Sequence, residues 1–185
     1  MRVEKLISEA AAPWIANTVG FLVAGVSSGM PIVGVVGAVL TGPVPMSAIL
    51  WMVKRGVLID HHASERAQRN SVFLVLFLAA ATVGAVLLIA GSTRALLLLW
   101  EAGMFSTLVL WIVTSLCRVK ASVHVAVWTV NIVALSLAVS PWLWGFVTLI
   151  GVVAWGRVKV GAHSRMEVAI GAIIGLVATV IANVL

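Results

Sequence analysis

The sequence predicts an all-α membrane protein, a polytopic bundle of six or seven transmembrane helices with its active site at one membrane face. Of the 185 residues, 62% are hydrophobic and only 10% are charged, whereas soluble domains average about 45–50% apolar and about 25% charged residues. The run from Val72 to Gly91 carries no charge, and the run from Ala95 to Cys117 carries only Glu101. Because about 20 apolar residues cross a ~30 Å hydrocarbon core, such continuous runs are typical of transmembrane helices.

Seven apolar segments follow one another along the chain, at residues 13–29, 31–53, 71–91, 95–117, 122–139, 141–156 and 166–185. Gly29 and Pro31 indicate a tight turn between the first two segments. Pro43 and Pro45 predict a kink in the second, because proline interrupts the hydrogen bonds of a helix interior. The segment 141–156 is short for a complete span.

The first twelve residues differ from the rest, and we expect 1–12 to form an interfacial segment before a single transmembrane domain over 13–185. Leu6, Ile7 and Ala10 lie among four charged residues, a pattern that indicates a short amphipathic helix at the membrane surface. These charges, and the direct continuation into further spans, argue against a cleavable signal peptide. The single cysteine, Cys117, allows no internal disulfide.

Three of the connections between spans are polar: Lys54–Asn70, Arg118–His124 and Gly156–Glu167. Two spans separate each from the next, so all three return to the same side of the membrane. That side carries all four histidines and nine of the twelve Lys and Arg residues. The basic excess predicts that this side is cytoplasmic in a multi-pass protein of the cell membrane. The net charge of +6 then reflects lipid headgroups, topology or an anionic substrate rather than a nucleic-acid partner.

The third polar connection carries the clearest chemical signal. His163 and Glu167 are four residues apart, so they share a face if the segment is helical. A carboxylate at that spacing can fix one imidazole nitrogen and leave the other as a base or nucleophile. The same pair could instead cap a membrane helix. Gly171 and Gly175 follow as a small-residue face for close helix packing.

The other two polar connections also have structural explanations. Asp60–Asn70 could be a solvated loop with juxtamembrane positive charge, and Ser122 could cap the helix that follows it. A metal site is disfavoured, because His61 and His62 are adjacent and no His-Glu-x-x-His pattern occurs. The excess of Arg and Lys favours an anion, so we expect no metal and no other cofactor.

Taken together, the clusters resemble the motifs of the type 2 phosphatidic acid phosphatase superfamily, which includes the vanadium haloperoxidases. The family's third motif is Ser-Arg, five residues, His, three residues, Asp; it matches Arg157, His163 and Glu167 in spacing, with Gly156 in place of Ser.

The second motif of that family, Pro-Ser-Gly-His, corresponds to Ala121–His124, which retains Ser122 and the histidine. The first motif is Lys, six residues, Arg-Pro. His62 stands seven positions before Arg69, and Asn70 replaces the proline. The resemblance extends from about residue 60 to residue 175.

The resemblance implies hydrolysis of a lipid or polyprenyl phosphate or diphosphate through a phosphohistidine, without a metal. His163 is then the nucleophile, Glu167 orients its ring, and His124 protonates the leaving group and activates water. The phosphate-binding residues are Arg157, Arg69, Lys120 and Ser122, with Arg66 and His62 as second choices. The expected partners are membrane lipid and the lipid substrate. The oligomeric state is not predicted.

Two alternatives belong to other functional classes. A transporter or channel for an anion or amphiphile needs polar residues near the middle of the membrane, and the candidates are Asn17, Glu101 and Asn131. A lipid-binding or assembly protein of the same architecture needs no hydrolase activity. Because the ionisable residues gather at one face, the sequence favours chemistry at the membrane surface over transport.

Overall fold

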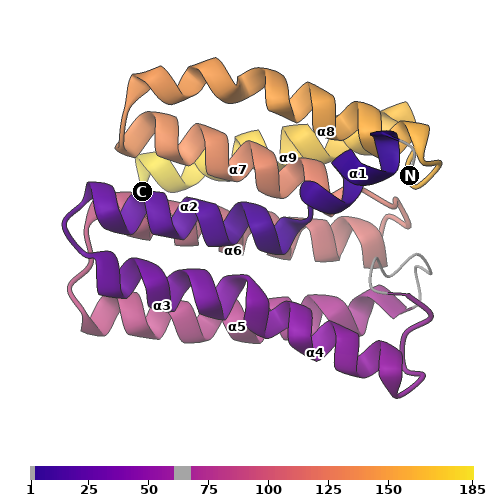
Figure 1. Ribbon diagram of the computed structural model, residues 1–185, viewed down its shortest axis with the longest axis horizontal. Coiled ribbons are helices and arrows are strands. Elements are labelled where there is room, and N and C mark those ends of the chain that lie inside the picture. Colours follow the sequence, from indigo (N-terminus) through magenta and orange to yellow (C-terminus); the bar gives the residue numbers. More distant parts are fainter. Residues whose placement is uncertain (1–2, 61–67) are drawn as a thin grey trace.

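The computed structural model describes residues 3–60 and 68–185 and shows an all-helical bundle, as the sequence predicts (Figure 1). Its elements, in order, are α1 (Val3–Ala10), α2 (Pro13–Ser27), α3 (Pro31–Thr41), α4 (Pro43–Lys54), α5 (Arg69–Ile89), α6 (Arg94–Ser115), α7 (Val123–Ala138), the 3₁₀ helix η2 (Pro141–Phe146), α8 (Val147–Lys159) and α9 (Arg165–Val184). All seven apolar segments therefore correspond to helices.

Five helical stretches of the described chain are long and apolar enough to cross a membrane: Pro31–Lys54, Arg69–Ile89, Arg94–Ser115, Pro141–Lys159 and Arg165–Val184. The pair α1 and α2, bent by 49°, is a sixth candidate, and α7 is a shorter apolar helix. The predicted kink in the second segment is confirmed, because α3 ends at Thr41 and α4 begins at Pro43. The short segment beginning at Pro141 reaches 19 residues because its helix continues to Lys159.

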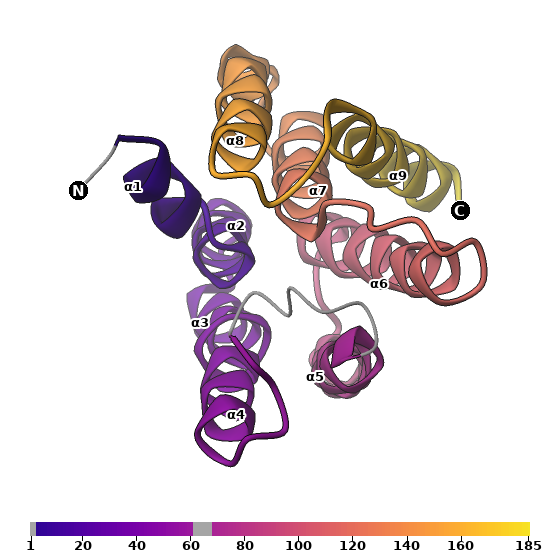
Figure 2. The same ribbon diagram turned by 90° about the vertical axis from the view of Figure 1, so that its right-hand side faces the viewer.

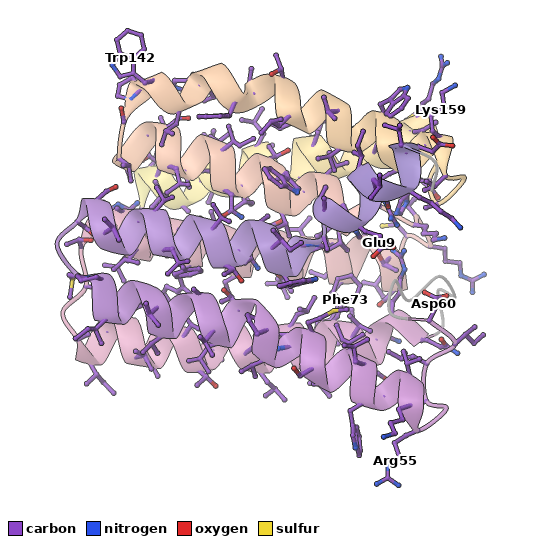
Figure 3. All side chains as sticks on the ribbon, viewed as in Figure 1. Glu9, Arg55, Asp60, Phe73, Trp142 and Lys159 are labelled. Carbon is purple, nitrogen blue, oxygen red and sulfur yellow. The ribbon has the colours of Figure 1, made fainter. Side chains whose placement is uncertain are left out.

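The polar connections lie together at one end of the bundle. Figure 1 shows the described parts of the α4–α5 connection, the α6–α7 connection and the α8–α9 connection at the right-hand end, beside α1. Asp60, Glu9 and Lys159 mark that end in Figure 3, and Trp142 marks the opposite end. We call the end that carries these connections the polar end. The sequence prediction that the three polar connections share one face of the bundle is therefore confirmed.

Helix α7 is the most enclosed element, and it packs against α2, α6, α8 and α9 (Figure 2). Its close approach to α9 depends on the two glycines that the sequence singles out. A Cβ at Gly171 would lie 2.5 Å from the Ser122 carbonyl oxygen, and one at Gly175 would lie 2.5 Å from that of Ala126. Small residues at this interface thus hold the start of α7 against the start of α9.

Helix α1 covers the polar end of α8. A Cβ at Gly156 would lie 3.0 Å from Cγ2 of Ile7, so the two helices are in close contact. Ser8 is buried in this contact, while Val3 and Leu6 are exposed. The predicted amphipathic helix therefore also serves as a wall over the polar end of the bundle.

The topology predicts the accessibility of single cysteines in a Cys117→Ser background. Ile59→Cys and Lys159→Cys, both at exposed positions of the polar end, should react together with a membrane-impermeant maleimide in sealed vesicles of one orientation. Ala90→Cys, at the opposite end of α5, should be protected under the same conditions and react only after the membrane is permeabilised. Opposite accessibility of Ile59→Cys and Lys159→Cys would contradict the shared face.

Candidate active site

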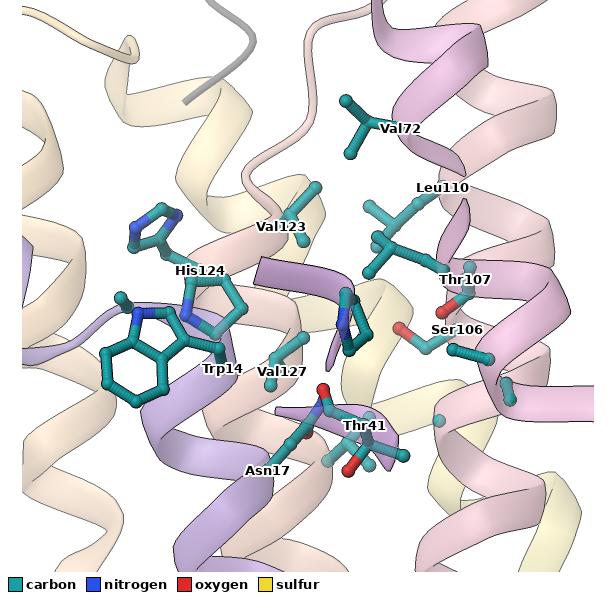
Figure 4. Close-up of a pocket in the computed structure, with 18 of the residues that line it drawn as sticks. Trp14, Asn17, Thr41, Val72, Ser106, Thr107, Leu110, Val123, His124 and Val127 are labelled. Atoms are coloured by element: carbon teal, nitrogen blue, oxygen red, sulfur yellow. The ribbon is translucent and has the colours of Figure 1, made fainter. Parts of the chain in front are cut away.

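A cavity of about 170 Å³ opens inside the bundle near the polar end and has two chemically distinct parts. Its polar part is lined by Glu9, Arg69, His124, Arg157 and His163. Its longer part is mainly apolar and runs between α2, α4, α5, α6 and α7, past residues such as Phe73, Leu76, Leu99, Trp100, Leu110 and Val127. Figure 4 shows His124 beside Trp14, with Val127 and Leu110 further along the cavity. The cavity thus joins charged and titratable groups to a space suited to hydrocarbon.

The imidazole of His163 is fixed in one tautomer by the backbone. Its Nδ1 lies 3.1 Å from the carbonyl oxygen of Lys120, in the α6–α7 connection. Because a carbonyl oxygen can only accept a hydrogen bond, Nδ1 must carry the proton. In the neutral ring Nε2 then bears the lone pair, which is the arrangement that a nucleophile or base requires. The side chain lies in the α8–α9 connection and is 6% exposed.

Glu167 combines a structural contact with an electrostatic one. Its carboxylate accepts a hydrogen bond from the Ser164 backbone N–H at 2.8 Å, and its own N–H donates to Ser164 Oγ at 3.2 Å. This capping box starts α9. The same oxygen, Oε2, lies 3.5 Å from Nδ1 of His163. Glu167 therefore caps α9 through Ser164, while its role in orienting His163, which lies before α9, stays a prediction. The closer partner of His163 is the Lys120 carbonyl.

Burial and neighbouring positive charge lower the pKa of His163 to about 4 from its ordinary value of 6.5. Burial contributes most, followed by Arg157, Arg69 and Lys120, while Glu167 acts in the opposite direction. The ring is consequently neutral at physiological pH. A neutral imidazole can attack an electrophile without first losing a proton.

Two buried arginines lie at the polar part of the cavity. Arg157, near the end of α8, donates a hydrogen bond from Nη1 to Ser8 Oγ at 2.5 Å. Its Nε is buried and has no hydrogen-bond partner within the described residues. Arg69, the first residue of α5, donates from Nη1 to the Ala121 carbonyl oxygen at 3.3 Å. Their exposures are 3% and 5%. Asp60 acts electrostatically on both arginines, together with Glu9 on Arg157 and Glu167 on Arg69.

The other predicted site residues are placed differently. His124, on the first turn of α7, lines the cavity and is 6% exposed. Lys120 and Ser122 are not among the lining residues; the Ser122 hydroxyl is fully buried, and its backbone N–H donates to the Glu167 carbonyl oxygen at 3.0 Å. Their assignment to phosphate binding stays a prediction. Arg66 and His62 lie outside the described residues.

Sequence reasoning missed the contribution of α1. Ser8 holds Arg157, and Glu9 lines the cavity and interacts electrostatically with that arginine. Neither residue belongs to a motif, and a serine on a short amphipathic helix gives no specific signal. The role of Ser8 becomes evident only from the packing of α1 on α8, which buries this serine beside Arg157.

No known protein family, curated protein or solved structure matches the chain. Its interpretation therefore depends on the residues themselves. Within residues 3–60 and 68–185, no three His, Cys, Asp or Glu side chains are arranged to hold a metal ion.

The lowered pKa of His163 predicts a titration that can be observed directly. In ¹⁵N-histidine spectra of the protein in micelles, this ring should stay neutral, protonated on Nδ1, down to about pH 5 and titrate near 4. His163→Gln identifies its signals. Between about pH 6.5 and 4, His163 is protonated in the unfolded chain but stays neutral in the folded protein. The free energy of unfolding should therefore decrease as pH falls through this window. A midpoint near 6.5, or a neutral ring protonated on Nε2, would contradict the site geometry.

Proposed function

We propose that this protein is an integral membrane phosphatase that hydrolyses a lipid or polyprenyl phosphate or diphosphate through a phosphohistidine. The observation that supports this most strongly is the cavity itself. It brings a neutral, oriented histidine and two buried arginines to one end of an otherwise apolar space. The resemblance of the three sequence clusters to the type 2 phosphatidic acid phosphatases points to the same chemistry.

The charge of the polar part favours a phosphate group as its ligand. Burying a guanidinium is costly unless a counter-charge or hydrogen-bond acceptor accompanies it. Glu9 and Asp60 act electrostatically on Arg157, and Glu167 and Asp60 act on Arg69. A phosphate offers several acceptor oxygens that match the planar donors of arginine, and it would give the buried Nε of Arg157 a partner.

In the first step, Nε2 of His163 attacks phosphorus in line with the bond to the leaving oxygen. The new N–P bond forms as that P–O bond breaks, and protonated His124 gives its proton to the leaving oxygen. The phosphorylated ring, still protonated on Nδ1, becomes positive. The Lys120 carbonyl and the Glu167 carboxylate, 3.1 and 3.5 Å from Nδ1, stabilise that charge. Arg157 and Arg69 stabilise the phosphoryl oxygens.

In the second step, water replaces the nucleophile. His124, now neutral, takes a proton from a water molecule as the water oxygen attacks phosphorus. The N–P bond breaks, its electron pair returns to Nε2, and inorganic phosphate leaves. Both histidines end in their starting states, so the cycle consumes one water for each phosphate ester bond broken.

The apolar part of the cavity favours an amphiphilic substrate over a soluble phosphate. Its walls come from membrane-spanning helices, so a hydrocarbon chain could stay at membrane depth while its phosphate reaches the polar end. Burial of each CH₂ group contributes about 0.8 kcal/mol. A soluble phosphate gains nothing from this space.

The residues that a transporter would use near mid-membrane are paired with one another. Asn131 donates to Asn17 at 3.1 Å, and Arg94 lies 2.6 Å from Glu101. A lipid-binding protein without hydrolase activity would use the same cavity, and the following experiment distinguishes it.

Phosphoenzyme trapping tests the proposed roles. Acid quenching during turnover of a radiolabelled lipid phosphate should leave acid-labile label on His163, located by mass spectrometry. His163→Ala should lose labelling and turnover together. His124→Ala should still be labelled by a substrate with a good leaving group, and its turnover should fall roughly 10²–10⁴-fold. Glu167→Gln should slow turnover but leave a folded protein.

Arg157→Gln and Arg165→Gln form a matched pair for the phosphate-binding role. Each removes one positive charge from the polar end, but Arg165 is exposed and does not line the cavity. Only Arg157→Gln should weaken hydrolysis strongly. Label on His124, or full activity of His163→Ala, would overturn the assignment. Binding of lipid phosphate without label or phosphate release would favour the lipid-binding alternative.

A further inference from the structure

The apolar part of the cavity contains a band of uncharged polar side chains that the proposed hydrolysis does not use. Asn17 of α2, Thr41 of α3, and Ser106 and Thr107 of α6 all line the cavity. Figure 4 shows Asn17 and Thr41 together at the deep end, with the Ser106 hydroxyl pointing into the cavity from α6. Placing polar side chains at membrane depth costs free energy, so a cluster of them around one cavity suggests a ligand-binding role.

Ser106 and Thr114 of α6 both carry buried hydroxyls without a hydrogen-bond partner within the described residues, and of these two only Ser106 lines the cavity. It is 2% exposed, and its Oγ is buried with no hydrogen-bond partner within the described residues. A helical hydroxyl commonly donates to the carbonyl four residues earlier. Thr41, Thr129, Ser136 and Thr179 all do so here, at 2.7–2.8 Å. The Ser106 hydroxyl instead faces the cavity with an unused donor, which costs about 1–3 kcal/mol if nothing accepts it.

Helix geometry gives the depth of the band. Asn131 follows His124 by seven residues on α7, a rise of about 10 Å at 1.5 Å per residue. Its amide Nδ2 donates to Asn17 Oδ1 at 3.1 Å, so Asn17 lies at that level. Asn17 in turn donates to the Thr41 carbonyl oxygen at 3.4 Å, and its amide carries a second N–H. Asn17 therefore lies about 10 Å below His124 along the axis of α7.

We propose that Ser106, together with Asn17, forms a second subsite that receives a carbonyl oxygen of the bound amphiphile. The missing partner of Ser106 is an acceptor, which an ester or amide carbonyl supplies and a plain hydrocarbon or isoprenoid chain does not. An uncharged acceptor also suits a band in which no charged side chain takes part. This subsite selects lipid phosphates with a carbonyl a few bonds from the phosphate, and it rests on the proposed function in taking a lipid phosphate as the ligand.

Two lipids that differ only in this group test the subsite. Diacyl glycerol phosphate carries ester carbonyls, and dialkyl glycerol phosphate of equal chain length has ether links instead. Apparent affinity is measured from protection of the detergent-solubilised protein against thermal unfolding, and kcat/KM from phosphate release. The ester lipid should be preferred about 2–10-fold in affinity, the factor that one net hydrogen bond contributes.

Ser106→Ala should remove this preference by weakening the ester lipid alone, leaving affinity for the ether lipid unchanged. Ser136→Ala is the matched control, because Ser136 is equally buried at 2% but donates within its own helix and does not line the cavity. It should keep the preference. Equal affinity for both lipids, or a preference that survives Ser106→Ala, would overturn the subsite.

The binding and hydrolysis measurements separate the two proposals. A Ser106-dependent ester preference in binding, without phosphate release, would contradict the hydrolase function and leave the subsite standing. Phosphate release without any ester preference would contradict the subsite and leave the hydrolase function standing. Failure of both lipids to bind would overturn the subsite and the proposed substrate class together.

Discussion

Hydrocarbon solvent accepts no unpaired backbone groups, so the chain can cross the membrane only as complete helices, and every two crossings return it to the same end. The site depends on this constraint. Arg69 begins α5, His124 lies in the first turn of α7, and Arg157 lies in the last turn of α8, shortly before His163. These residues span almost a hundred positions in sequence, yet all four line the polar part of one cavity. The interiors of the same helices supply the apolar walls beneath them.

Within this frame, the α6–α7 connection orders the site through its backbone. The Lys120 carbonyl fixes the His163 tautomer, the Ala121 carbonyl accepts from Arg69, and the Ser122 N–H meets the Glu167 carbonyl. Glycines 171 and 175 allow α9 to approach closely enough for these contacts. The result is a neutral His163 beside two buried arginines. We propose that this arrangement binds a phosphate group and positions His163 to attack it.

The sequence predicted what composition and spacing control. Apolar runs located every span, Pro43 located the break between α3 and α4, and the two-span spacing placed the polar connections at one end. It could not predict contacts made by backbone atoms, such as that between the Lys120 carbonyl and His163, because any residue type can make them. Nor could it predict that Ser8 would reach Arg157 from a helix about 150 residues away, or that the Ser106 hydroxyl would face a cavity rather than its own helix. Those features arise from how the helices pack.

We propose that a membrane-embedded cavity presents an amphiphile's phosphate to His163 for hydrolysis. The most direct measurement is phosphate release by purified protein from a panel of lipid and polyprenyl phosphates, with a water-soluble aryl phosphate as comparison and a strong chelator present throughout. We expect phosphate release from at least one amphiphilic phosphate, far faster than from the soluble one, and no release with His163→Ala. Absence of release from every amphiphile by folded, lipid-binding protein would contradict it, as would equal rates for soluble and amphiphilic substrates.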